Sequence, residues 1–117
     1  MKDIYGELDY KGKKYKTVFN INVMEAIQDE FGSISKWGEL TSGENGEPNI
    51  KAIKYGFTRM LNEAIEMDNE DNGTEIKLLT PNFVGRMLTD IGLEKTANTL
   101  HETVVNSTKS TDDQKNV

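Results

Sequence analysis

The feature that most constrains the fold is one change in the spacing of apolar residues, at about residue 20. Before it, apolar and polar side chains alternate along residues 4–10 and again along residues 14–19, which is the period of a β-strand with one buried face. Gly12 lies between the two runs and supplies the positive φ that a short hairpin loop requires. The sequence therefore predicts a β-hairpin over about residues 3–19, which must pack on other elements because an isolated hairpin is marginal in water.

Beyond the hairpin, apolar residues recur at every third or fourth position, which is the spacing of amphipathic helices. The first helix is expected to begin at an Asn22 cap and to end before Gly32. Glu25 would complete a capping box with Asn22, and Ile21 would pack on Ala26 as a hydrophobic staple.

Glycine, proline and polar residues separate the helices that follow. Trp37 is expected to cover one end of the core from a short amphipathic segment. Gly56 lies inside the clearest helix, where it costs about 1 kcal/mol relative to alanine unless a neighbour packs closely on it. Thr80 is expected to cap a helix that has Pro81 at its first position. The expected segments are residues 35–40, helices at about 50–67, 81–91 and 93–106, and a flexible tail at 107–117.

Strands and helices are thus segregated along the chain, which predicts an α+β fold with an N-terminal β-hairpin followed by four or five α-helices. At 117 residues, a chain buries roughly two-thirds of its unfolded surface and can form one core without cross-links. We therefore expect one compact domain at residues 1–106. The absence of cysteine excludes disulfides and thiolate chemistry.

The net charge of −6 argues against nucleic acid as a partner, because phosphates must be neutralised by clustered cations. A helix–turn–helix-like spacing occurs at residues 87–100, but its second helix offers only Lys95 and Asn98 to base edges. No segment has the ~18 apolar residues needed to cross a bilayer, so we expect a cytoplasmic protein. One lysine cluster could contact an anion, although the solvated edge of a hairpin explains it better; its members are Lys11, Lys13, Lys14 and Lys16.

Catalytic and metal-binding patterns are weak. His101 is the single histidine, and its neighbours offer no nucleophile or second ligand. Asp68, Glu70 and Asn72 resemble the opening of a calcium-binding loop, but the closing glutamate at the twelfth position is replaced by Leu79. We therefore expect no enzyme activity, no cofactor and no metal.

Four segments in order carry a family resemblance. They are the hairpin at residues 7–19, the helical run at residues 20–32, Ile53-Lys54-Tyr55-Gly56-Phe57, and Leu79-Thr80-Pro81-Asn82-Phe83-Val84-Gly85-Arg86-Met87-Leu88 before the last helix. In order and residue class, residues 5–106 resemble the tail assembly chaperones of long-tailed phages and prophages. The resemblance implies a non-catalytic protein that keeps the tape measure protein soluble, recruits tail tube subunits to it and is absent from the finished particle.

Two classes of function remain open from the sequence. As a chaperone, the chain would bind a hydrophobic helical partner in an exposed apolar groove, and self-association would suit a protein that coats a long partner. As an acidic regulator or DNA mimic, it would bind a host or phage factor through carboxylates on one face. Methionine repacks easily against varied partners, so the residues expected to line the groove are Phe57, Met60, Met67 and Met87.

Overall fold

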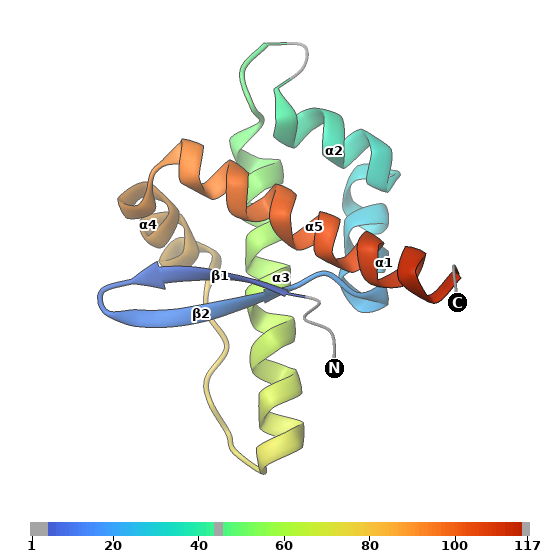
Figure 1. The fold of residues 1–117 in the computed structure, drawn as a ribbon. Helices are drawn as coiled ribbons and strands as arrows, with labels where there is room; N and C mark the ends of the chain where they lie inside the picture. Colours follow the sequence, from blue (N-terminus) through green and yellow to red (C-terminus); the bar gives the residue numbers. More distant parts are fainter. Residues whose placement is uncertain (1–4, 44–45, 116–117) are drawn as a thin grey trace.

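The computed structural model describes residues 5–43 and 46–115, and the side chains of residues 6–43 and 46–105. Within these residues the chain forms an N-terminal hairpin followed by five helices (Figure 1), which confirms the predicted α+β class. The elements in chain order are β1 (Tyr5–Tyr10), β2 (Lys13–Val18), α1 (Ile21–Phe31), α2 (Ile34–Ser42), α3 (Ile50–Asn72), α4 (Pro81–Ile91) and α5 (Leu93–Lys115).

The hairpin is closed by a two-residue turn, Lys11-Gly12, in which both residues have positive φ, 50° and 78°. Positive φ at both positions matches the twist of the flanking antiparallel strands. Leu8 pairs with Tyr15 and Tyr10 with Lys13, so the buried Leu8 and Tyr10 share one face of the sheet. The predicted hairpin is therefore confirmed, with one residue fewer in its loop than the sequence pattern indicated.

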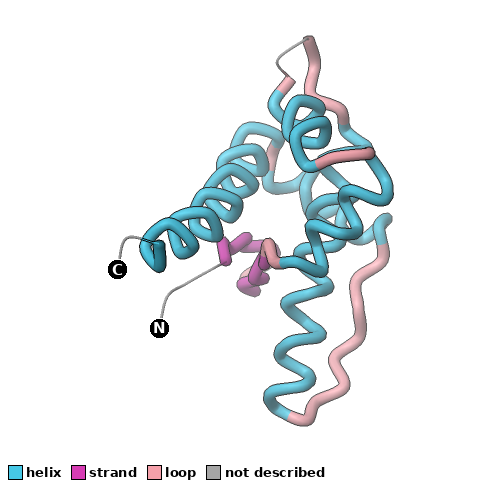
Figure 2. Tube along the Cα trace, turned by 90° about the vertical axis from the view of Figure 1, so that its right-hand side faces the viewer, coloured by secondary structure: helices cyan, strands magenta, loops and turns pink. Residues whose placement is uncertain are grey.

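α3 is the central element of the fold, and α1, α2, α4 and β2 all pack against it. The hairpin lies between two helices, because β2 contacts α3 while β1 contacts α5 (Figures 1 and 2). Side chains from these elements form one core, whose largest fully buried members are Trp37, Phe57, Ile27, Met60, Leu61, Met87, Val23 and Val84.

The start of α1 differs from the prediction. Its cap is Asn20, whose side chain accepts a hydrogen bond from the backbone N–H of Val23 (3.2 Å). Asn20 and Asn22 both donate to Oε2 of Glu63 on α3, at 2.8 and 3.0 Å. The predicted cap and staple are wrong: the Asn20 side chain bonds to the first helical turn, so the helix begins two residues earlier, and Ile21 is 76% exposed.

Three helices extend beyond the ranges expected from sequence. α2 covers Ile34–Ser42, and α3 continues to Asn72, where Gly73 caps it in the left-handed region (φ 64°). Residues 68–72 are therefore helical, and the resemblance to an open calcium loop does not hold in the structure. α5 is helical to Lys115. The side chains of the expected flexible tail at 107–117, and its last two residues entirely, lie outside the described part, so its flexibility stays a prediction.

Gly56 has the close neighbour that its place inside a helix requires. A β-carbon at this position would lie 2.6 Å from Cζ2 of Trp37, well inside normal contact distance. Trp37 is itself fixed, because its Nε1–H donates to the carbonyl of Ala52 (3.0 Å) and its ring stacks on Phe19 at 5.9 Å between centroids. Glycine thus allows the α2 indole to lie directly on α3, and the prediction that Trp37 belongs to the core is confirmed.

Candidate partner-binding surfaces

Three of the four residues expected to line an exposed groove are inside the core. Phe57, Met60 and Met87 are 0% exposed, and Met67 is half-buried, within 3.9 Å of the Asn20 amide at its sulfur. A partner cannot contact the first three in this conformation. The predicted groove is wrong at these positions because the hairpin and α4 cover the apolar stripe of α3 in which Phe57 and Met60 lie.

Among the side chains that the structure describes, no three of histidine, cysteine or acidic type are placed to hold a metal ion. His101 is exposed on α5. None of the helices in the described part of the chain combines the length and hydropathy of a membrane span.

One apolar hollow lies between the N-terminal half of α3, α4 and the start of α5, and we call it the α3–α4–α5 groove. It has a volume of about 320 Å³. Ile50 and Leu93, the first residues of their helices, are 61% and 48% exposed at this groove. The residues that line it are Ile50, Ile53, Lys54, Gly85, Leu88, Thr89, Leu93 and Thr96.

The α3–α4–α5 groove also holds an unusual buried hydroxyl. Thr96 is fully buried, and its Oγ1 has no hydrogen-bond partner among the described residues. A buried hydroxyl without a partner costs about 1–3 kcal/mol, so this site is not optimised for the stability of the isolated chain. Sequence reasoning overlooked the groove, although Ile50 and Leu93 carried a signal as apolar residues at helix starts, where the first turn is usually exposed.

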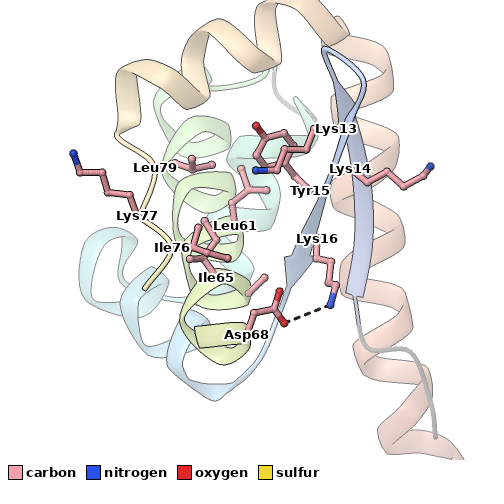
Figure 3. Close-up of a pocket in the computed structure, with 11 residues that line it drawn as sticks. Lys13, Lys14, Tyr15, Lys16, Leu61, Ile65, Asp68, Ile76, Lys77 and Leu79 are labelled. Carbon is pink, nitrogen blue, oxygen red and sulfur yellow. Dashed lines mark hydrogen bonds and ion pairs between the residues drawn. The ribbon is translucent and has the colours of Figure 1, made fainter. Parts of the chain in front are cut away.

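A second hollow, of about 170 Å³, runs beside β2 and is called here the β2-edge groove (Figure 3). One wall is β2, the floor is the second half of α3, and the other wall is the extended segment between α3 and α4. Leucine and isoleucine side chains from the floor and the far wall gather in it. The lining residues are Lys13, Lys14, Tyr15, Lys16, Leu61, Ala64, Ile65, Asp68, Ile76, Lys77 and Leu79.

The far wall of the β2-edge groove is held by two asparagines of α3. Asn62 donates to the carbonyl of Leu79 (3.0 Å) and accepts from its N–H (2.8 Å). Asn69 makes the same pair of bonds with Ile76, at 3.0 and 2.9 Å, and also accepts from the hydroxyl of Thr74 (2.7 Å). Each asparagine amide thus bonds to the backbone N–H and C=O of one residue, as a neighbouring strand would. These bonds fix the segment along α3 although it has no secondary structure of its own.

Cations dominate the rim of the β2-edge groove. Nζ of Lys16 lies 3.5 Å from a carboxylate oxygen of Asp68, the one acidic residue in the lining. Nζ of Lys13 lies over the Tyr15 ring, 5.1 Å from its centroid. Lys14 and Lys77 point away from the hollow in Figure 3. Three of the four lysines in the cluster singled out from sequence therefore belong to one groove in a chain of net charge −6.

Comparison of the chain with protein-family models, with curated proteins and with solved structures finds no match.

Proposed function

We propose that this chain is a phage tail assembly chaperone, a non-catalytic protein of the host cytoplasm that keeps the tape measure protein soluble and recruits tail tube subunits to it. The observation that supports a chaperone role most directly is the α3–α4–α5 groove. Two of its exposed side chains, Ile50 and Leu93, are large and apolar. Such a surface suits an amphipathic helix, which places apolar residues in a groove at helical spacing.

The lining of the groove favours binding that depends little on charge. Four of its eight residues are aliphatic, and Lys54 is the one charged residue in it. Binding should therefore depend weakly on salt, whereas an acidic regulator would lose its partner as salt screens the charges. The chain as a whole has a net charge of −6, which keeps a complex with an apolar partner dispersed in water.

The test is co-expression with the long helical protein encoded downstream, followed by measurement of the soluble fraction of each protein alone and together. We expect the partner to be soluble only in the presence of this chain, and the two to co-purify at moderate salt. Unchanged solubility with no co-purification would refute the chaperone function. Binding that disappears at moderate salt would instead favour the acidic regulator.

Two matched variants connect the result to the groove. Ile50→Glu places a charge in the groove, and Ile21→Glu places the same charge on an exposed isoleucine outside it. Both residues are the first of their helices, where a glutamate interacts similarly with the helix dipole. We expect Ile50→Glu to abolish rescue of the partner's solubility and Ile21→Glu to retain it. Equal effects of the two variants would place the binding surface elsewhere.

A further inference from the structure

Three lysines of the cluster, Lys13, Lys14 and Lys16, lie on β2, whose outer edge no other strand covers in the part of the chain that the structure describes. Within the described residues the sheet consists of β1 and β2 alone. The far edge of β1 faces α5, whereas the far edge of β2 borders the β2-edge groove (Figure 3). A strand with one side open presents a row of backbone donors and acceptors that another chain can pair with.

The lining of the groove shows that it follows this edge and not a face of the sheet. Successive side chains of a strand point to opposite faces, so a hollow over one face would contact alternate residues. Here four consecutive residues of β2, Lys13 to Lys16, line the hollow. The groove therefore runs along the backbone of β2, with Leu61 and Ile65 of α3 beneath it.

β1 indicates which side chains a strand beside β2 needs. Asp9 and Glu7 pair directly with Lys14 and Lys16 across the hairpin, and Nζ of Lys14 lies 3.3 Å from a carboxylate oxygen of Asp9. Between these acidic residues, Leu8 points into the core. The strand that already pairs with β2, which is β1, thus alternates acidic and apolar residues at these positions.

We propose that the open edge of β2 binds an extended, acidic segment of a partner protein as a third strand. The segment's alternate apolar side chains would enter the floor formed by α3 and by Ile76 and Leu79, and its carboxylates would face the lysines. The same lysines repel a basic strand or a second copy of β2, so the edge is selective for acidic partners. This site is separate from the α3–α4–α5 groove and does not depend on the proposed function.

The first experiment measures binding of three fluorescein-labelled synthetic peptides to the full chain by fluorescence anisotropy. In the first peptide leucine and glutamate alternate, in the second lysine replaces every glutamate, and the third is the first peptide with alternate backbone nitrogens methylated. We expect only the first peptide to bind, because the second has the wrong charge and the third cannot complete a strand ladder. Equal binding of the methylated peptide, or no binding of the first, would overturn the proposal.

Matched variants test each wall of the groove with the first peptide. Removing two cations as Lys14→Ala with Lys16→Ala, the lysines on the face that the segment's carboxylates would share, should weaken binding about tenfold, whereas Lys36→Ala with Lys95→Ala changes the net charge equally outside the groove. On the far wall, Ile76→Ser should weaken binding and Leu78→Ser should not, although both side chains are about half exposed, at 50% and 47%.

Hydrogen exchange distinguishes strand addition from loose adhesion. Bound peptide should slow exchange of amide protons within Lys13–Val18 and leave those of α5 unchanged. Equal weakening of the peptide by the two lysine pairs, or no change in exchange along β2, would contradict the proposed site.

Discussion

Gly56→Ala should destabilise this protein even though alanine is the better helix former. In an open helix the change is favourable by about 1 kcal/mol. Here the added methyl would lie 2.6 Å from Cζ2 and 3.1 Å from Cε2 of Trp37. Unstrained carbon atoms approach to about 3.5–4.0 Å, so either the indole or α3 must move.

The indole has little freedom to move. Trp37 is 2% exposed, its Nε1–H is bonded to the Ala52 carbonyl, and Phe19 stacks on its ring. Forcing an extra methyl into a packed core costs typically 1–3 kcal/mol, and the fixed ring favours the upper part of that range. After the gain in helix propensity, we expect a net loss of about 1–2 kcal/mol in the free energy of unfolding.

The assay is urea denaturation followed by circular dichroism, with Gly38→Ala as the matched control. Gly38 lies inside α2, and a β-carbon there would meet nothing within 4 Å. That variant should be stabilised by about 0.5–1 kcal/mol, because it gains helix propensity without a clash. The two alanine variants should therefore differ by roughly 1.5–3 kcal/mol.

A second background tests the stated cause. In Trp37→Phe the atoms nearest to the new methyl are absent, so Gly56→Ala should cost less there, and the double-mutant cycle should show a coupling of at least about 1 kcal/mol. A urea midpoint of Gly56→Ala equal to or above that of the unaltered protein would refute the clash with Trp37. An equal loss of unfolding free energy in the unaltered and Trp37→Phe backgrounds would refute it as well.

Three further predictions concern buried hydroxyls, the segment before α4 and the contact between β1 and α5. The hydroxyl of Thr103 bonds to that of Thr17 (2.7 Å) and donates to the Thr99 carbonyl (2.9 Å), so Thr103→Val should lower the free energy of unfolding by about 1–3 kcal/mol. Thr96 is equally buried, but its hydroxyl has no partner among the described residues. Thr96→Val should therefore be neutral or stabilising in the same urea titration. Asn62→Ala should cost about 1–2 kcal/mol and speed exchange of the Leu79 amide proton, whereas the exposed Asn98→Ala should change stability by less than about 0.5 kcal/mol. Equal exchange rates of the Leu79 amide in the two variants would contradict the role of the Asn62–Leu79 hydrogen bonds. Gly6→Ala should lower the melting temperature by several degrees, because its methyl would overlap the Thr103 hydroxyl; a melting temperature at or above that of the unaltered protein would contradict this contact.

Local signals in the sequence determined the order and type of the elements. Alternation before residue 20, Gly12 in the hairpin turn, and Thr80 with Pro81 at the start of α4 are local signals, because each acts only on residues a few positions away. Their structural counterparts are the ones observed. At Gly56 the sequence left two outcomes open, an uncompensated cost of about 1 kcal/mol or a closely packed neighbour, and the structure shows that Trp37 is that neighbour.

Only the tertiary structure decided which apolar residues are exposed. Phe57, Met60 and Met87 are as apolar as Ile50 and Leu93, but the first three lie beneath the hairpin or between packed helices, and the other two do not. Likewise, Asn20 is the α1 cap, whereas Asn22 lies inside the helix and bonds to Glu63, 41 residues away. Periodicity shows that a helix has an apolar face, but the packing of distant elements determines how much of that face they cover. The sequence thus determined the hairpin and helices, and long-range packing determined the core, the two grooves and the open edge of β2.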